Sequence, residues 1–251
     1  MAAALRLAGA TALVAQADPC TVFASIGYRS GERTTSAYQR KTGRSERTAE
    51  TASTETPRDV ALGSCSTGNG YPRGVEPVEI DAGAYYLRQL RADPHVDDRA
   101  ALMTAFADPQ HRRYVLNYQL RTLDEATEYV TLRAAQWACD ERCSWAVAEP
   151  ASGRLLGEVG LRDLDLTFRT AEASVWTHPD ERGKGIAAVA LTAAIQFGFG
   201  GLGLHEIAYR HDASNTASEA VAQRAGFTRV GVDDRPSPTG EPLVRWVRKP
   251  S

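Results

Sequence analysis

The sequence predicts a mixed α/β domain in which a mostly antiparallel central sheet of six to seven strands is flanked by helices, after a disordered N-terminal extension. The composition changes near residue 75, which separates an expected extension at 1–74 from an expected folded domain at 75–251. Three strand-like segments follow one another between Ser144 and Thr177 with no helix between them. Only antiparallel strands can be joined by such short turns, and the remaining helical segments are left to cover the faces of the sheet.

The extension lacks the residues from which a hydrophobic core is built. Between Arg29 and Asp59 there is no Val, Ile, Leu, Met, Phe or Trp, and Gly63–Gly74 continues as a Gly-rich linker. Such a segment cannot bury enough apolar surface to offset the entropy lost on ordering, so we expect disorder. Residues 1–17 combine a short apolar run with a small-residue ending. They fit a secretory signal or an over-long translation start, and the sequence leaves both open.

The charge balance argues against two classes of binding protein. Lys and Arg number 29 and Asp and Glu 31, which gives a formal net charge of -2. A chain without a basic excess is poorly suited to bind nucleic acid or an anionic membrane, so neither partner is expected. The uncharged run 185–204 has the length of a membrane span, but it is rich in Ala and Gly and predicts a buried helix. The four Cys residues show no metal-ligand spacing, and no metal site is predicted.

The first part of the folded domain predicts one strand followed by helices. Alternating side chains predict a strand at Tyr85–Leu90. Asp93 followed by Pro94 has the pattern of a helix cap and first turn, and predicts a helix to about Phe106, with a second helical piece at 110–115. Thr122 followed by two acids predicts the start of a helix that ends near Asp140.

The middle of the domain predicts a three-stranded antiparallel meander. Its strands are expected at Ser144–Ala148, Arg154–Leu166 and Ala171–Thr177. Pro150–Gly153 has the composition of a hairpin turn between the first two. The second strand is long, and a bulge is expected near Gly160.

The last part of the domain alternates helices and strands. An apolar helix is predicted at Gly185–Phe199, then a strand at Glu206–Arg210 and a capped helix at Asn215–Ala225. Gly226 follows as the C′ residue that ends this helix. Two closing strands are expected at about Thr228–Val232 and Pro242–Val247.

One loop between a strand and a helix carries the chemical signal. The strand ends at Thr177, and the loop continues to Arg182-Gly183-Lys184-Gly185-Ile186-Ala187, where the apolar helix begins. Glycines allow positive φ and close approach of the backbone to a ligand. The free N–H groups of residues 182–187 are therefore expected to converge at a helix N-terminus and form a cradle for a diphosphate. Arg182 and Lys184 are expected to add positive charge at its rim.

Two familiar phosphate loops do not fit this stretch. A P-loop requires Lys followed by Ser or Thr, whereas Lys184 is followed by Gly185. The dinucleotide fingerprint requires a third glycine where Ala188 stands, and it opens a parallel unit rather than following an antiparallel meander. The cradle is thus of another type.

The stretch resembles the acetyl-coenzyme A loop of the GNAT N-acetyltransferases, Gln/Arg-x-x-Gly-x-Gly/Ala, which Arg182–Ala187 fits position for position. Asn215-Thr216-Ala217-Ser218 and the later Arg224-Ala225-Gly226-Phe227 resemble the branch that contains the ribosomal-protein alanine N-acetyltransferases. The resemblance covers about residues 75–249. The chain departs from that branch at Val175 and Val189, where Tyr and Glu are often found, and this bears on the choice of substrate.

The resemblance implies a GNAT-like fold, acetyl-CoA as the acetyl donor and a primary amine as the acceptor, in the cytoplasm. The pantetheine arm would lie along Val175, Trp176 and Thr177, beside a parallel strand at 206–210 that splays away. The amine would attack the thioester directly in a ternary complex, with no covalent intermediate on a Cys. The acceptor would be a protein N-terminus or a small-molecule amine such as a polyamine or an aminoglycoside. A non-catalytic acyl-CoA sensor is the alternative, and a monomer and a homodimer are both left open.

Within this resemblance, four residues are candidates for the chemistry. Glu172 is the candidate general base, with an exposed strand carboxylate as the plain structural alternative, and Glu158 is the second choice. Ser218 could give a proton or a hydrogen bond to the departing thiolate, or serve only in the first turn of its helix. Asn215 is either a helix cap or a cap that also reaches the pantetheine amides.

Four other polar or aromatic residues are expected to be structural. His178 and His211 lie in predicted turns near the loop, and we expect both to be exposed rather than catalytic. Trp137 and Trp145 are expected in the core rather than stacked on a ligand.

Overall fold

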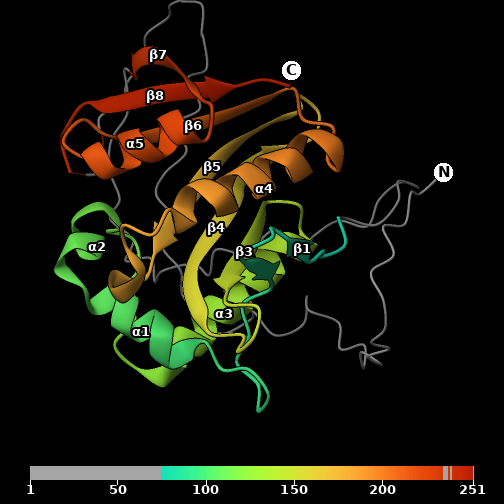
Figure 1. The fold of residues 1–251 in the computed structure, drawn as a ribbon, viewed down its shortest axis with the longest axis vertical. Coiled ribbons are helices and arrows are strands. Elements are labelled where there is room, and N and C mark those ends of the chain that lie inside the picture. Colours follow the sequence, from blue (N-terminus) through green and yellow to red (C-terminus); the bar gives the residue numbers. More distant parts are fainter. Residues whose placement is uncertain (1–74, 234–236, 238, 251) are drawn as a thin grey trace, which may run out of the picture. The chain divides into compact units, whose positions relative to one another are not determined.

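The computed structural model describes residues 75–233, 237 and 239–250. The predicted disordered extension at 1–74, with the candidate signal segment 1–17, lies outside the described residues. The described part folds around one mixed sheet (Figure 1).

The sheet contains eight strands in the order β1-β2-β3-β4-β5-β6-β8-β7. All neighbouring strands are antiparallel except β5 and β6, which are parallel. The mostly antiparallel sheet is therefore confirmed, with a two-residue edge strand, β1, that was not predicted. The strands are β1 Ile80–Asp81, β2 Tyr86–Arg88, β3 Arg142–Ala148, β4 Leu155–Asp165, β5 Thr170–Thr177, β6 Glu206–Asp212, β7 Thr228–Asp233 and β8 Leu243–Arg248.

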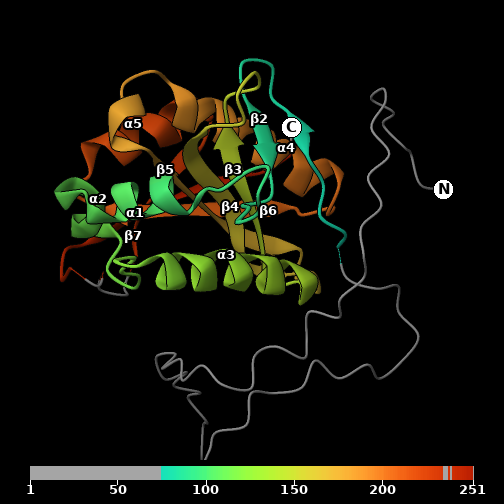
Figure 2. The same ribbon diagram turned by 90° about the horizontal axis from the view of Figure 1, so that it is seen from below.

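Helices cover both faces of this sheet. The helix α3 lies along one face, and α4 and α5 lie on the other, as Figure 2 shows. The helices are α1 Arg99–Ala107, α2 Pro109–Tyr114, α3 Leu123–Ala138, α4 Ile186–Gly200 and α5 Thr216–Arg224, with a short 3-10 turn at Pro179–Glu181. Because α4 begins directly after the turn that follows β5, the end of β5 and the start of α4 lie side by side.

The alternation of side chains along the strands divides the core into two clusters. Val159 and Leu161 of β4 pack with Ile207 of β6 against α4. Trp137 and Trp145 belong to this cluster and are 1% and 0% exposed, which confirms that they are core residues. A second cluster joins α1 and α3 to the other side of the sheet, and Trp176 of β5 packs against it. Neighbouring residues of β5 thus face opposite layers.

The first helix begins later than the sequence predicts. Asp93 and Pro94 lie in a turn that the bridge between Ala92 and Asp97 closes, and α1 begins only at Arg99. The carboxylate of Asp93 accepts the N–H groups of His95 and Val96 within this turn. Asx turns of this kind compete with helix caps for the same residue types, so the cap pattern at 93–94 was misleading.

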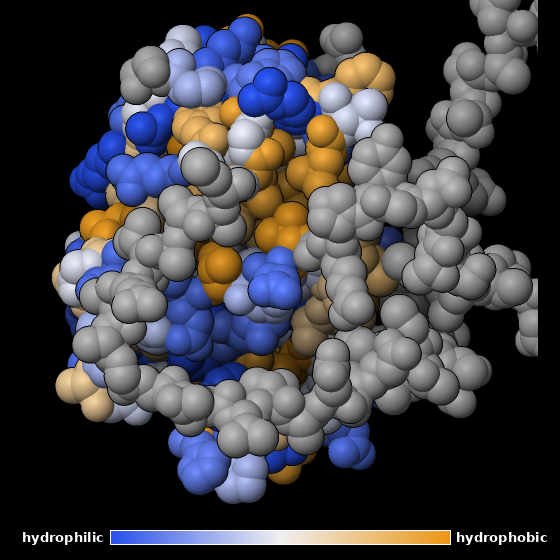
Figure 3. All heavy atoms as spheres, turned by 90° about the vertical axis from the view of Figure 1, so that its right-hand side faces the viewer, coloured by the Kyte–Doolittle hydropathy of each residue, from blue (hydrophilic) through white to orange (hydrophobic). Residues whose placement is uncertain are grey.

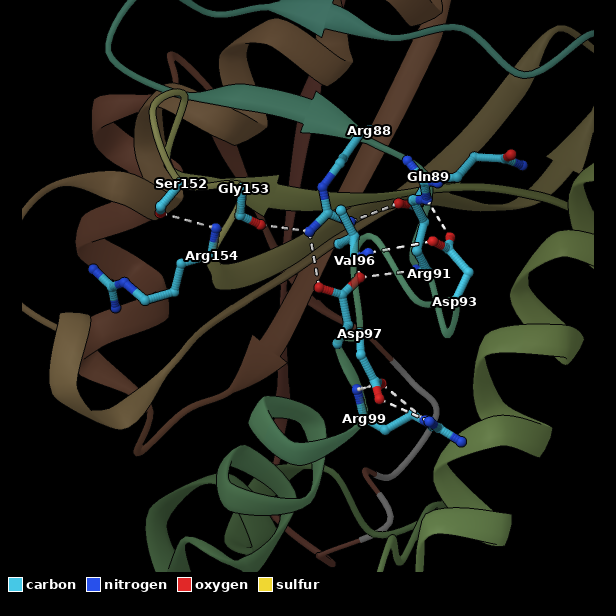
Figure 4. A network of polar contacts seen from close by, with 11 residues as sticks. Arg88, Gln89, Arg91, Asp93, Val96, Asp97, Arg99, Ser152, Gly153 and Arg154 are labelled. Atoms are coloured by element: carbon cyan, nitrogen blue, oxygen red, sulfur yellow. Dashed lines mark hydrogen bonds and ion pairs between the residues drawn. The ribbon is translucent and has the colours of Figure 1, made fainter. Parts of the chain in front are cut away.

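A buried ion pair fixes this connection to the rest of the domain. Arg88 donates two hydrogen bonds to Asp98, both at 2.8 Å. It donates a further bond to the carbonyl of Gly153 in the β3–β4 hairpin, which Figure 4 shows. Asp98 is thereby engaged in a tertiary contact and makes no side-chain cap for α1. The charged partner of Asp98 lies ten residues away in the sequence, which local patterns do not register.

Most other local predictions are confirmed. Thr122 and Glu125 form a complete capping box at the start of α3. Gly226 has φ of +73° directly after α5 ends, as expected for a C′ glycine. The irregularity expected near Gly160 lies slightly further along β4, where the pairing with β5 shifts register between Arg162 and Asp165. Gly160 itself pairs regularly with Ser144 and Ser174, and a second register shift lies at Val147/Ala148 of β3.

The helix α4 carries no charged residue, and its far end lies on the side of the domain that faces the viewer in Figure 3. Figure 3 shows hydrophobic side chains reaching the surface on that side of the domain, between hydrophilic ones. Phe197, Phe199 and Leu202 are partly buried against the core there. Of the described helices, none combines the length and the hydrophobicity that a membrane crossing needs.

Candidate active site

A cavity of about 470 Å³ lies between the end of β5, the start of α4 and the helices α2 and α5. Ten of the twelve residues selected from the sequence line it, and Glu172 and Lys184 do not. The ten are Val175, Trp176, Thr177, Arg182, Gly183, Gly185, Ile186, Ala187, Asn215 and Ser218. The loop and the α5 motif, which lie far apart in the sequence, thus form one site.

The glycine loop presents unpaired backbone N–H groups to this cavity. Gly183 and Gly185 adopt φ of +79° and +78°, and Gly185 is the N-cap of α4 without any side-chain cap. In the described part of the chain, no protein acceptor faces the N–H groups of residues 183–188. The N–H of Arg182, which was expected to join them, instead donates to the carbonyl of Pro179 at 3.4 Å. The cradle therefore starts one residue later, at Gly183.

The two cations of the loop are already paired with acids. The guanidinium of Arg182 donates to Asp108 and Gln110 of the α2 region, and it lowers the pKa of Asp108. Lys184 donates to Glu181 at 2.8 Å, and Glu181 also accepts from Arg154 at 2.8 Å. Lys184 and Arg154 together lower the pKa of Glu181. The positive rim expected from the sequence is thus largely neutralised, and the amides remain as the groups free to bind an anion.

The strand before the loop is free of a partner on one side. The parallel pairing of β5 with β6 joins Thr170–Ala173 to Glu206–Tyr209 and stops there. Beyond Ala173, β5 continues to Thr177 while β6 turns to pair only with β8. This confirms the expected splay, and it leaves the β6 side of residues 174–177 without a strand neighbour in the described structure.

The wall opposite the loop is polar and comes from α5 and β6. Asn215 caps α5 by accepting the N–H of Ser218 at 3.1 Å. Burial raises the pKa of Tyr209, so its side chain is a neutral hydroxyl, and the neighbouring hydroxyl of Ser218 offsets part of this rise. Tyr209 lines the cavity and was not selected from the sequence. The period-two alternation of β6 places it on the same face as Ile207 and could have identified it.

The α2 side of the cavity contributes His111, which was also missed. Its ring lies 4.4 Å from Phe106 and 5.3 Å from Trp176, measured between ring centroids. Burial, with a further contribution from Arg182, lowers the pKa of His111 to about 4, so the ring is neutral at pH 7. Its Nε2 is buried with no hydrogen-bond partner in the described part of the protein. Nothing in the local sequence distinguishes this histidine from an exposed one.

Glu172 lies between two arginines instead of in the cavity. Its carboxylate accepts hydrogen bonds from Arg162 of β4 and from Arg210 of β6. Arg210 also donates to Asp233 of β7 at 2.7 Å, so the charges alternate across four strands. Glu172 is 6% exposed. Glu172 is therefore not the exposed strand carboxylate that was one of the two predictions. It is also not a free carboxylate, because both of its oxygens accept hydrogen bonds from arginines.

Glu158 is buried in a similar network on β4, opposite Trp176 of β5. It accepts from the hydroxyl of Tyr129 at 2.6 Å and from the indole of Trp176 at 3.2 Å. Burial alone would raise the pKa of Glu158, but Arg133 and Arg142 outweigh this effect and lower it. The carboxylate is 1% exposed and ionised, and it fixes the Trp176 side chain from below.

The two histidines near the loop are buried, which corrects the expectation that both are exposed. His178 caps the 3-10 turn and is 8% exposed. His211 is 6% exposed, and its Nε2 accepts the indole N–H of Trp246 at 2.9 Å. Both serve structural contacts, and in the described residues no group of three or more His, Cys, Asp or Glu could hold a metal ion.

Comparison with known proteins places this site in a family. The model of the acetyltransferase (GNAT) domain matches residues 85–228. The uncharacterised N-acetyltransferase YoaA of Bacillus subtilis is 24% identical over 153 residues, 61% of this chain and 84% of YoaA. YdaF of the same organism, a candidate ribosomal N-acetyltransferase, is 35% identical over 79 residues, 32% of this chain and 43% of YdaF.

A solved structure shares the fold. The spermidine N-acetyltransferase of Vibrio cholerae, in complex with CoA and spermine, superposes with a TM-score of 0.55 at 21% identity. The match covers 66% of this chain and 95% of that enzyme. At this identity, the similarity establishes the arrangement of strands and helices.

Proposed function

The chain belongs to the GNAT acetyltransferase family, and we propose that it transfers the acetyl group of acetyl-CoA to a primary amine. The observation that carries the proposal is the run of N–H groups at residues 183–188 that have no acceptor among the described residues and open onto the gap between β5 and β6. Such amides at a helix N-terminus bind phosphate groups without requiring a net positive surface. Because acetyl-CoA is a cytosolic metabolite, we place the reaction in the cytoplasm.

The geometry supports one orientation of the donor. The diphosphate would accept hydrogen bonds from the N–H groups that begin at Gly183. The pantetheine amides would pair with the free side of Val175–Thr177, as an added strand would. The thioester then reaches the gap that opens after Ala173, where β5 and β6 separate. Backbone N–H groups of β5 are available there to stabilise the negative charge that develops on the carbonyl oxygen.

The step proceeds by direct attack in a ternary complex. The nitrogen of the neutral amine bonds to the acetyl carbon, and the C–S bond breaks as the tetrahedral intermediate collapses. The nitrogen gives its extra proton to solvent. The hydroxyl of Ser218, which lines the cavity, gives a proton to the thiolate and regains one from solvent. Asn215 fixes the position of Ser218 by capping α5.

We assign Glu172 a positioning role. Its two arginine partners lie on β4 and β6, the strands on either side of β5. The network therefore ties β5 to both neighbours at the level where the β5–β6 pairing ends. A carboxylate held in this way fixes the width of the gap, and both of its oxygens already accept hydrogen bonds from arginines.

The charge of the cavity favours an acceptor with a single amino group over a polyamine. Among the described lining residues, Glu181 is the only acid, and its carboxylate is engaged by Arg154 and Lys184. A polyamine would bring further ammonium groups into a site without free acids to pair with them. The N-terminal α-amino group of a protein or peptide has no such requirement. The aromatic side chains of His111, Tyr114 and Trp176 can instead contact an apolar first residue.

An acceptor panel that follows release of free thiol from acetyl-CoA tests the function. The panel contains peptides with free N-termini, the same peptides with blocked N-termini, and spermidine. We expect thiol release with free peptides, none with blocked ones, and weaker release with spermidine. Binding of acetyl-CoA without transfer to any amine would instead support the sensor alternative. Faster transfer to spermidine than to every peptide would contradict the acceptor assignment but leave the acetyltransferase activity in place.

A further inference from the structure

The α2 side of the active-site cavity contains a buried polar atom that has no hydrogen-bond partner among the described residues. This atom is Nε2 of His111, a residue that lines the cavity and is 6% exposed. The other unpartnered buried side-chain atoms in the described part of the chain are guanidinium and indole nitrogens, which can only donate, and none of their residues lines the cavity. Buried polar atoms are nearly always paired in folded proteins, so an open one at the wall of a cavity indicates a ligand.

The ring of His111 is held in place by the protein itself. It packs against Phe106 of α1 at 4.4 Å and stands at 89° to Trp176 of β5 at 5.3 Å, both distances measured between ring centroids. The backbone N–H of His111 donates to Asp108, the cap of α2, at 2.8 Å. Burial lowers the pKa of the ring to about 4, so at pH 7 the imidazole is neutral and carries a free lone pair. A ligand therefore meets a neutral hydrogen-bonding nitrogen whose position is already fixed.

The position of His111 separates the space for the acceptor from the space for the donor. Its two ring neighbours belong to or pack against the second core cluster, whereas α4 packs on the first. A donor on the N–H groups of residues 183–188 and along the free side of β5 occupies the part of the cavity beside α4 and α5. The part beside α2 remains for the acceptor. There the side-chain oxygen of Gln110 is engaged by Arg182 at 3.0 Å, and His111 offers the open hydrogen-bond position.

Resting on the proposed function, we infer that His111 binds the acceptor, and that its Nε2 accepts a hydrogen bond from an N–H of the attacking amino group. An amine that attacks the thioester uses its own lone pair, so only its N–H groups remain for hydrogen bonds to the protein. A neutral imidazole nitrogen matches such a donor. The bond holds the amine so that its lone pair points toward the acetyl carbon.

A neutral partner has an advantage over a carboxylate at this point. A carboxylate beside the amine would stabilise the ammonium form, which has no lone pair and cannot attack. The imidazole of His111 makes a hydrogen bond to the neutral amine without adding a negative charge that favours protonation. His111 is in this way a specificity-determining residue for the acceptor, whereas the donor contacts at residues 183–188 are independent of it.

The test replaces the imidazole by a ring of similar shape that cannot form hydrogen bonds. His111→Phe keeps a ring between Phe106 and Trp176 but removes the lone pair. We expect kcat/KM for a peptide with a free N-terminus to fall about tenfold, which corresponds to one lost hydrogen bond. The affinity for CoA in calorimetric titration should be unchanged. The melting temperature should be equal or higher, because an unpartnered buried polar atom has been removed.

Two amide variants test whether the hydrogen bond itself matters. The side chain of His111→Gln is long enough to bring an amide oxygen near the former position of Nε2, and it should recover part of kcat/KM. The side chain of His111→Asn is shorter and should not. His95→Phe is the matched control, because His95 is exposed and does not line the cavity, and it should behave as the wild type.

The outcomes separate this inference from the proposed function. Wild-type kcat/KM in a folded His111→Phe protein would overturn the role of His111 and leave the acetyltransferase activity in place. A fall in kcat/KM that is matched by a loss of CoA affinity would also overturn it, because His111 would then support the donor site. If His111→Phe does not fold, equal rates in His111→Gln and His111→Asn would overturn the inference. Absence of transfer by folded wild-type protein to any amine would overturn the proposed function itself, and this inference with it.

Discussion

The two faces of β4, β5 and β6 are built from alternate residues of the same strands, yet they serve different ends. Toward α4 the strands present Val159, Ala173 and Ile207, which form the core that positions the helix and its glycine loop. Toward the other side they present Glu158 and Glu172, each held between arginines. The comparison teaches that a carboxylate on β5 or next to it can stabilise the position of that strand instead of taking part in the reaction. Burial and partners, rather than nearness, decide its role.

Removal of the Glu158 carboxylate should have the largest effect. Glu158→Ala leaves Arg133 and Arg142 buried without their common partner, so we expect the free energy of unfolding to fall by about 3–5 kcal/mol. Urea denaturation followed by circular dichroism measures this loss. Val159→Ala on the opposite face is the matched comparison, with an expected loss of about 1–3 kcal/mol. A smaller loss of unfolding free energy in Glu158→Ala than in Val159→Ala would show that Glu158 and its arginines do not stabilise the sheet.

The second largest effect is expected from protonation of His111, which should destabilise the domain as the pH falls. The pKa of His111 is lowered from 6.5 to about 4 in the folded protein, so the unfolded chain binds the proton more tightly. The stabilising contribution is therefore complete above pH 6.5 and is lost as the pH falls toward 4, by about 3 kcal/mol in total. Unfolding measured at half-unit steps of pH between 7 and 4 checks this slope. The His111→Gln variant should lose it, and an unchanged slope in that variant would assign the effect to other groups.

A close approach between β4 and β5 gives a third, smaller effect. A Cβ at Gly157 would lie 2.3 Å from the carbonyl oxygen of Trp176, so Gly157→Ala must push β5 away from β4. We expect a loss of about 1–3 kcal/mol in stability, together with weaker CoA binding. In Gly200→Ala, a Cβ would meet no atom within 4 Å, and this variant should change neither property appreciably. Wild-type CoA affinity in a folded Gly157→Ala protein would show that the strand position does not govern the site.

The smallest effect is expected for substitution of Glu172, although the same substitution would slow acetyl transfer greatly if Glu172 were the general base. Glu172→Gln keeps the shape of the side chain between Arg162 and Arg210, so the rate of acetyl transfer should stay within about threefold of the wild type. A general base in this position would contribute a factor of about 10²–10⁴. Initial rates at saturating acetyl-CoA distinguish the two, and a hundredfold fall with unchanged stability would restore Glu172 as the base.

The sequence predicted the parts of the site that depend on local backbone chemistry. The loop 182–187 follows from glycines that precede an apolar helix, and the cap at Asn215 follows from residues three apart. Ion pairs between residues far apart in the chain could not be predicted from the sequence, because they depend on how the strands and helices pack. Glu172 meets Arg210 across 38 positions, and Arg182 meets Asp108 across 74. The late start of α1 has the same origin, because a tertiary partner, Arg88, takes the side chain of Asp98.

Titration of two glycine variants with coenzyme A tests the central claim, that unpaired amides at the start of α4 bind the diphosphate. Gly185 and Gly153 both have positive φ, +78° and +72°, and a Cβ at either meets no protein atom within 4 Å. Gly185→Val and Gly153→Val should therefore lose similar amounts of stability, about 1–2 kcal/mol from the left-handed backbone. Only Gly185→Val places a side chain where the ligand lies, and it should lose CoA binding while Gly153→Val keeps it. Wild-type affinity in a folded Gly185→Val protein would contradict the account.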